Sequence, residues 1–332
     1  AHARIINIET ADAATMLGVV GIYTAPDLAD EFKPIRATSR MADYYATKLG
    51  VLACGKVRYV GEAVVAVVAE SRYLAEDAAE RVMIEYDPLG NAVDPLANIN
   101  DDSPLLHEDA GTNVLVTRTF HRGDVDEAMD GAAVRVRDTF HMHRKTPTAM
   151  ENRGYVADYD QGWRTLTLHS TTQIPGIVRD ALEEMLDIPG NRLRVIVPDM
   201  GGGFGGKTTI YLEPVAMVLS KKSGRPVRLA MTREEVFRAT GPAPGAVIDV
   251  RLGAAADGTL VAANVMRRLK PAAVVGFGGG SLREFLVHMA EGVPVDRVVI
   301  VLFLEAVQDR PERFFRGDVV EAADLLRGQR QA

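Results

Sequence analysis

The chain has 332 residues, of which 47% are hydrophobic, and its 38 basic and 45 acidic residues give a formal net charge of -7. This length and hydrophobic content are enough for about two domains with buried cores. The acidic balance gives no electrostatic reason to expect a nucleic-acid partner, because phosphates call for a basic face. The longest apolar runs, at residues 64–69 and 298–304, are far shorter than the ~20 residues that span a bilayer, so no membrane contact is expected.

The first 86 residues predict a compact α/β unit, because short apolar β-branched runs alternate with helical periodicity. Expected in chain order are strands at 4–9 and 19–24, a hairpin joining 57–60 to 63–69, a helix over 72–82 and a strand at 83–86. From residue 87 to 115, Pro, Asn, Asp and Gly predominate, which is typical of a connector. The single cysteine, Cys54, cannot form an internal disulfide or hold an iron–sulfur cluster, which takes about four cysteines.

A second domain is expected over residues 116–266. Its predicted elements are a strand at 134–144, a hairpin of 155–159 with 165–170, a helix over 177–186, a strand at 192–198, a helix over 210–219, and a hairpin of 247–252 with 260–265. The segment 267–332 is left unassigned. Within it, a helix is expected at 281–291 and an apolar run at 298–304.

Six glycines surround one Phe and one Lys in Asp199-Met-Gly-Gly-Gly-Phe-Gly-Gly-Lys-Thr208. The pattern fits both the dinucleotide-binding G-x-G-x-x-G and the P-loop G-x-x-x-x-G-K-[ST]. Because the glycines are predicted between a strand and a helix, free amides at the helix N-terminus are expected to hold an anion. The competing interpretation is a close-packed glycine turn without a ligand.

Gln173, in Ser170-Thr-Thr-Gln-Ile-Pro-Gly176, precedes Phe204 by 31 residues. This order resembles the molybdenum-binding large subunit of the xanthine dehydrogenase, aldehyde oxidase and carbon monoxide dehydrogenase family. Further stretches resemble the same family in the same order: residues 1–5, 57–70, 75–79, 85–89, 150–153, 224–228 and 232–235. The resemblance covers residues 1 to about 266.

The resemblance implies an α/β (α+β) fold, with an a/b hammerhead domain over 1–86 and the first part of a molybdopterin-binding domain over 116–266. The implied cofactor is molybdenum-molybdopterin, in its cytosine dinucleotide form. Gln173 would lie beside molybdenum without ligating it, and the backbone of Gly202, Gly203, Phe204 and Gly205 would face the pterin. Phe204 and Thr208 would shape the substrate pocket. The base, a Glu, is expected outside this sequence, so no catalytic residue is assigned here.

The implied function is oxidation of an aldehyde, an N-heterocycle or a related small substrate, with oxygen taken from water. Electrons would pass to iron–sulfur and FAD partner subunits of a cytoplasmic hetero-oligomer. Xanthine is disfavoured, because Thr208 stands where the xanthine-oxidising branch carries Glu. The chain is expected to be incomplete at both ends and inactive alone, and the alternative is a noncatalytic, truncated binding or assembly module.

The P-loop and the dinucleotide-binding interpretations of the glycine loop each lack a residue that the function requires elsewhere in the sequence. A P-loop needs a second strand ending in Asp to hold magnesium, and the best candidate is the run 298–304 followed by Glu305. A dinucleotide site needs an acidic residue about twenty positions on; Glu213 comes too early and Glu234 rather late. His141 and His143 share one face of a predicted strand, and we expect a solvated face, because zinc takes three or four ligands.

Overall fold

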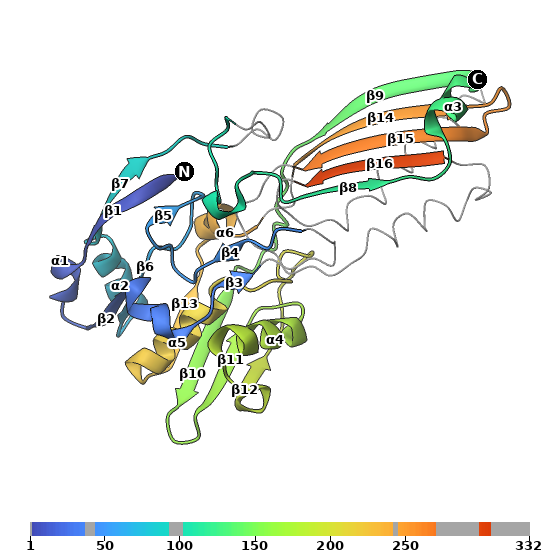
Figure 1. Ribbon diagram of the computed structural model, residues 1–332. Helices are drawn as coiled ribbons and strands as arrows, with labels where there is room; N and C mark the ends of the chain where they lie inside the picture. Colours follow the sequence, from blue (N-terminus) through green and yellow to red (C-terminus); the bar gives the residue numbers. More distant parts are fainter. Residues whose placement is uncertain (1, 37–43, 93–101, 242–244, 270–298, 307–332) are drawn as a thin grey trace.

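A computed structural model describes residues 2–36, 44–92, 102–241, 245–269 and 299–306. The predicted helix at 281–291 lies outside these residues. Figure 1 shows an N-terminal region of short strands and helices, a sheet flanked by helices α4 (Pro175–Leu186) and α5 (Glu213–Ser223), and a long five-stranded sheet that extends away from both.

The described part of the N-terminal region contains three small antiparallel sheets, the third a pairing of the two-residue strands β3 (Ile35–Arg36) and β4 (Lys48–Leu49). Strand β1 (Ala3–Glu9) lies between β5 (Lys56–Val57) and β7 (Met83–Pro88), and β2 (Val19–Thr24) pairs with β6 (Val65–Ala69). The expected strands at 4–9, 19–24 and 83–86 are therefore present. The remaining short elements are α1 (Ala11–Ala14), η1 (Pro26–Glu31) and α2 (Arg72–Ala79).

The hairpin expected between 57–60 and 63–69 does not form. Val57 pairs with Ala3 of β1, whereas β6 pairs with β2. Gly61, in the segment between them, instead contacts helix α6 (Arg233–Ala239). Its φ is +93°, and a Cβ on it would lie 2.8 Å from the Arg238 carbonyl carbon. A tight turn that joined the two strands would withdraw Gly61 from that helix.

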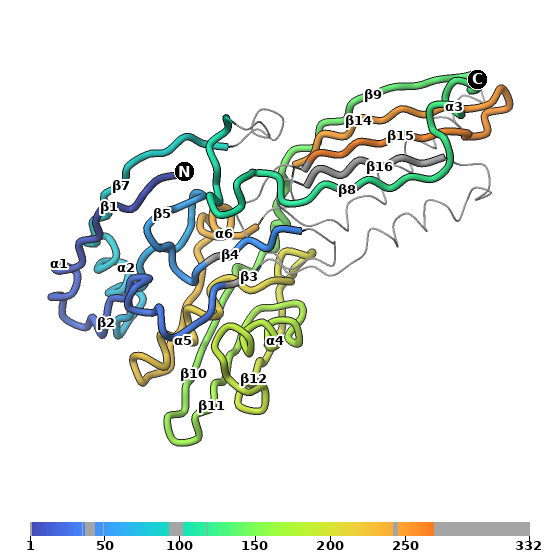
Figure 2. Tube along the Cα trace, in the orientation of Figure 1, coloured from blue at the N-terminus to red at the C-terminus, as the bar shows by residue number. Residues whose placement is uncertain are grey.

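The second sheet has the order β12-β11-β10-β13 and holds the site. Strands β10 (Gly154–Asp160) and β11 (Thr165–Ser170) form the expected antiparallel hairpin, which Figure 2 shows projecting from the molecule. Helix α4 (Pro175–Leu186) then connects β11 to its parallel neighbour β12 (Leu193–Ile196). Helix α5 (Glu213–Ser223) follows the glycine loop, and β13 (Val227–Ala230) pairs with β10.

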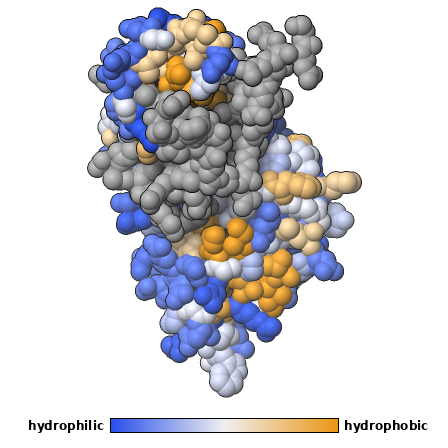
Figure 3. Space-filling view, turned by 90° about the vertical axis from the view of Figure 1, so that its right-hand side faces the viewer, coloured by the Kyte–Doolittle hydropathy of each residue, from blue (hydrophilic) through white to orange (hydrophobic). Residues whose placement is uncertain are grey.

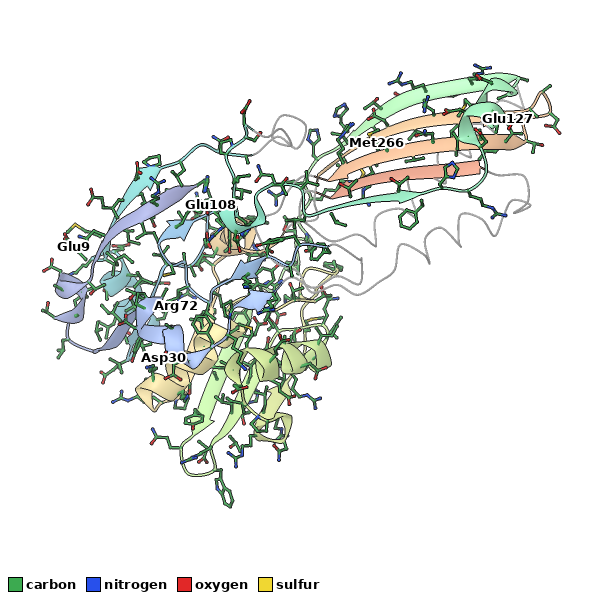
Figure 4. All side chains as sticks on the ribbon, in the orientation of Figure 1. Glu9, Asp30, Arg72, Glu108, Glu127 and Met266 are labelled. Carbon is green, nitrogen blue, oxygen red and sulfur yellow. The ribbon has the colours of Figure 1, made fainter. Side chains whose placement is uncertain are left out.

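The long sheet has the order β8-β16-β15-β14-β9. Its strands are β8 (Val116–Phe120), β9 (Val134–Met142), β14 (Ala246–Ala254), β15 (Leu260–Leu269) and β16 (Val299–Ala306), and α3 (Val125–Asp130) packs on it through Met129 and Ala262. The boundary expected at residue 266 falls inside β15, where Figure 4 labels Met266. Residues 299–306, from the segment without an assignment, pair with β15 and β8.

One hydrophobic core joins the N-terminal region to the second sheet. Leu28 and Leu52 from the first 86 residues lie in the same buried cluster as Leu168 and Met217. Charged groups add to this contact, since Glu31 pairs with Lys221 of α5 at 2.6 Å. A smaller buried cluster, with Ala3, Val57 and Val64, lies within the N-terminal region itself.

The described part of the connector is held in place by specific contacts. Lys56 Nζ lies 2.7 Å from Glu108 Oε1, at the position that Figure 4 labels, and Arg58 Nε donates to the Leu106 carbonyl at 3.0 Å. Asn113 Oδ1 accepts from the Leu106 amide at 3.1 Å. Residues 102–115 thus pack on the N-terminal region, with a short η2 turn at Glu108–Ala110.

None of the helices in the described part of the chain combines the length and apolar character that crossing a bilayer requires.

Candidate functional site

The glycine loop, residues 201–206, lies between β12 and α5 but is not the first turn of that helix. Helix α5 begins at Glu213 rather than at residue 210, so six residues separate it from Gly206. The amides of the loop are therefore arranged by the loop itself. The prediction that they belong to a helix N-terminus is wrong.

Three residues of the loop have left-handed backbone conformations: Gly202 at φ +102°, Phe204 at +48° and Gly205 at +82°. For Phe204 this conformation is uncommon, because its Cβ crowds the backbone. Phe204 is 75% exposed, and Met150, the residue before Glu151, is 93% exposed. Figure 3 shows that apolar surface on the face turned to the viewer gathers in patches.

Gln173 fastens the second half of the loop to the end of β11. Its side-chain Oε1 accepts from the backbone amides of Gly205 at 3.0 Å and Lys207 at 3.1 Å. The backbone amide of Gln173 donates to the Lys207 carbonyl at 2.8 Å. A Cβ on Gly203 would lie 2.4 Å from the Gln173 side chain, so any larger residue there would have to displace Gln173 from its hydrogen bonds. Because Oε1 is occupied by two donors, the side chain offers its Nε2 group, a pure donor, to anything bound beside the loop.

Glu151 fastens the loop at its two ends. Its Oε2 accepts from the Gly201 amide at 3.0 Å and lies 2.5 Å from Lys207 Nζ. The Lys207 side chain is only 4% exposed, so its charge is held inside the protein next to this carboxylate.

Beneath the loop lies a buried polar network. The Arg153 guanidinium donates to the Gly206 carbonyl and stacks 4.0 Å from the centre of the Tyr211 ring. Glu213 is 1% exposed and accepts from the Tyr211 amide at 2.6 Å and Ser170 Oγ at 3.2 Å. Burial raises the pKa of the Glu213 carboxyl, while the nearby Arg153 charge opposes the rise.

Three successive amides of the loop lack a partner in the part of the chain that the structure describes. Within the described residues, no hydrogen bond uses the N–H groups of Gly202, Gly203 or Phe204, whereas those of Gly201, Gly205, Gly206 and Lys207 are all engaged. In front of Gly205 there is open space, since a Cβ would meet nothing within 4 Å. Successive free amides beside an open backbone can receive a polar or anionic ligand, so the residues fit a cofactor rich in oxygen and nitrogen.

The same contacts count against the two alternatives for the glycine pattern. A P-loop lysine must reach phosphate, but Lys207 Nζ is buried against Glu151. A ribose-binding acid must be accessible, but Glu213 is enclosed. The described residues contain no group of three or more His, Cys, Asp or Glu side chains that could hold a metal ion.

Thr208 lies at the end of the loop, and its hydroxyl donates to the Gly205 carbonyl at 3.0 Å. The structure thus brings together all the predicted site residues: Gln173, Gly202, Gly203, Phe204, Gly205 and Thr208. Their roles toward a cofactor and a substrate stay predictions. Sequence reasoning missed the parts played by Glu151 and Arg153, although both belong to the stretch 150–153 that resembles the family.

This fold and this loop define a class of protein, and comparison with family models identifies it. A model described as the molybdopterin cofactor-binding domain matches residues 106–318, and one described as the aldehyde oxidase and xanthine dehydrogenase a/b hammerhead domain matches residues 1–90. The chain belongs to the family of molybdenum-binding large subunits of xanthine dehydrogenase, aldehyde oxidase and carbon monoxide dehydrogenase, which are molybdenum-dependent oxidoreductases.

Particular relatives agree. The chain is 36% identical over 261 residues to the nicotine 6-hydroxylase large subunit of Paenarthrobacter nicotinovorans, covering 78% of this chain and 32% of that protein. It is 34% identical over 279 residues to the carbon monoxide dehydrogenase large chain of Hydrogenophaga pseudoflava, covering 80% and 34%. The crystal structure of quinoline 2-oxidoreductase from Pseudomonas putida 86 superposes with a TM-score of 0.83 at 32% identity, over 92% of this chain and 39% of that one.

The chain therefore spans about a third of the length of these curated relatives. The match to the molybdopterin model also runs past residue 266, into the segment for which the sequence offered no assignment.

Proposed function

We propose that this chain supplies the glycine-loop side of the cofactor site in a molybdenum hydroxylase. The reaction would be oxidation of an aldehyde, an N-heterocycle or a related small substrate, with oxygen from water and electrons passing to iron–sulfur and FAD partner subunits. The observation that carries the proposal is the loop 201–206, whose amides at Gly202, Gly203 and Phe204 have no hydrogen-bond partner among the described residues and adjoin the open space at Gly205. When bound, molybdenum-molybdopterin supplies the two-electron redox chemistry of the family.

Each loop residue has a distinct proposed task. The amides of Gly202, Gly203 and Phe204 would donate to polar atoms of the cofactor, in its cytosine dinucleotide form. Gln173 Nε2 would donate a hydrogen bond on the metal side, because its Oε1 already accepts from Gly205 and Lys207. The exposed ring of Phe204 would form an apolar wall of the substrate pocket, with Thr208 at the edge.

Family relatives with named substrates support the class but differ among themselves. The names of three relatives specify nicotine, carbon monoxide and xanthine. We propose a substrate other than xanthine, because Thr208 replaces the Glu of the xanthine-oxidising branch. A hetero-oligomer in the cytoplasm is part of the same proposal; the names of the relatives describe large subunits or chains.

The experiment measures molybdenum and pterin in the purified chain after expression in a host that makes the cofactor. Gly205→Asn is the test variant, because Asn tolerates a left-handed backbone and would fill the open space. Gly111→Asn is the matched control: Gly111 has φ +67° and also nothing within 4 Å of a Cβ, but it lies in the connector. We expect wild type and Gly111→Asn to retain the cofactor and Gly205→Asn to lose most of it.

Equal cofactor content in both variants would contradict the assignment of the loop. A folded wild-type chain without molybdenum or pterin would favour the noncatalytic binding or assembly module instead.

A further inference from the structure

One carboxylate oxygen holds the two ends of the glycine loop together. Glu151 Oε2 accepts from the amide of Gly201, where the loop begins, at 3.0 Å. The same oxygen lies 2.5 Å from Nζ of Lys207, which follows the last glycine. The Glu151 amide returns a bond of 3.4 Å to the Gly201 carbonyl. The entry and the exit of the loop therefore converge on one side chain that is fifty residues away in sequence from Gly201.

Lys207 is the point at which this contact meets the one made by Gln173. Its side chain is 4% exposed, and an ammonium group in that position needs an ionic partner. Its backbone amide donates to Gln173 Oε1 at 3.1 Å, and its carbonyl accepts from Thr172 Oγ1 at 3.1 Å. The side chain and the backbone of Lys207 thus hold different neighbours, so a shift of Lys207 would disturb both.

We infer that Glu151 and Lys207 form a positioning pair that sets the glycine loop in its binding conformation before any ligand arrives. Neither charge is offered to the ligand, since each is directed at the other. Their effect is indirect: closing the loop at its ends fixes the backbone between them, where Gly202, Gly203 and Phe204 keep their amides free. A preformed site binds more tightly, because the loop does not have to be ordered on binding.

That the pair serves cofactor binding rests on the proposed function. That the pair orders the loop does not, and it can be tested without a cofactor. Amide hydrogen–deuterium exchange, followed by mass spectrometry of peptides over 199–208, measures the loop in the full chain without a cofactor. Cofactor content, measured on the same preparations, then measures the consequence for binding. Failure of the proposed function would appear as a wild-type chain without cofactor, whatever the exchange data show.

Two variants test the contacts at the two ends of the loop separately. Lys207→Met removes the charge at the exit but leaves Glu151 as acceptor for Gly201, so we expect faster exchange at Gly205 and residue 207 only. Glu151→Ala removes both contacts, so we expect the Gly201 amide to exchange faster as well, by about tenfold or more for the loss of a charge-assisted bond. Cofactor content should fall in both variants, and further in Glu151→Ala.

A rescue and a control distinguish positioning from general stability. Glu151→Gln leaves Lys207 buried without a carboxylate, and adding Lys207→Met removes that charge, so the double variant should exchange more slowly than Glu151→Gln alone. Lys221→Met is the control, because it breaks the pair between Lys221 and Glu31, 2.6 Å long and remote from the loop. It should leave the exchange of the loop unchanged.

Three results would overturn the inference. The first is unchanged loop exchange in Glu151→Ala. The second is acceleration that extends equally to β10 and β11, which would mean that the fold as a whole had loosened. The third is a loosened loop whose cofactor content equals that of a cofactor-bearing wild type.

Discussion

Gln173 carries an acceptor and a donor on one side chain, and the loop engages the acceptor. Replacing Gln173 with Glu keeps oxygens for the amides of Gly205 and Lys207 but removes the Nε2 donor. Replacing it with Ala leaves both amides without their acceptor, at a cost of about 1–3 kcal/mol for each one that water cannot reach. We expect Gln173→Ala to lower the free energy of unfolding in urea, and Gln173→Glu to leave it nearly unchanged while cofactor content falls. Equal stability loss in both variants would contradict this division.

His107 predicts a pH dependence of stability. Its side chain is 6% exposed, and burial, assisted by the charge of Arg58, lowers its pKa to about 4. The unfolded chain takes up the proton first, near pH 6.5, so stability is complete above that pH and decreases as the pH falls toward 4. The total loss is on the order of 3 kcal/mol.

Urea unfolding between pH 4 and 7 checks this dependence. His107→Asn should show a smaller decrease on acidification than wild type, whereas the exposed His141→Asn should follow wild type. Parallel pH profiles for wild type and His107→Asn would show that the burial of His107 has no energetic consequence.

At the scale of elements, α6 supports the segment that holds the loop. Thr232 Oγ1 accepts from the Glu235 amide at 3.1 Å, and Glu235 Oε2 accepts from the Thr232 amide at 2.6 Å, a reciprocal cap at the start of the helix. Arg233, the first residue of α6, donates to the Met150 carbonyl at 2.7 Å, directly beside Glu151.

Replacing Thr232 with Ala should therefore lower stability by about 1 kcal/mol and also loosen the Met150 segment, because the first turn of α6 frays. Thr232→Ser retains the hydroxyl and is the control. Urea unfolding gives the first effect, and amide exchange of peptides that contain Met150 gives the second. A stability loss of the same size in Thr232→Ser would mean that the cap is not responsible.

At the scale of the whole molecule, the N-terminal region and helix α6 fit closely at Gly61. A Cβ there would lie 2.8–2.9 Å from backbone atoms of Arg238 and Ala239, and φ is +93°. Gly61→Ala should cost roughly 1–3 kcal/mol, since backbone cannot move aside as a flexible side chain does. Gly55→Ala is the control, because Gly55 has φ +68° with nothing within 4 Å.

Both variants place an alanine in a left-handed conformation, but only Gly61→Ala also meets close backbone atoms. The difference between their free energies of unfolding in urea therefore measures the cost of the close contact alone. If Gly55→Ala and Gly61→Ala lost equal stability, the fit between the two regions would not contribute. The shared core, in which Leu28 and Leu52 pack with Leu168, leads us to expect one unfolding transition rather than two.

Much of the local structure could be predicted because it depends on neighbours in sequence. Period-two alternation and the turn at residues 160–162 located β10 and β11, and helical periodicity located α4. The spacing of Gln173 and the glycines, together with the colinear stretches around them, indicated the family. Each of these features depends on residues close together in the sequence. Each can therefore be recognised without knowing which other segment packs against that part of the chain.

The pairing of distant segments was decided only by the tertiary structure. Residues 65–69 pair with β2, and Gly61 before them packs closely on α6; no local pattern in the sequence records either contact. Lys207 looks like a phosphate ligand in the sequence, but the fold buries it against Glu151, fifty-six residues away in the chain. A sequence pattern shows which side chains can be buried or charged; the partner that each one meets is set by long-range contacts, which exist only once the chain has folded.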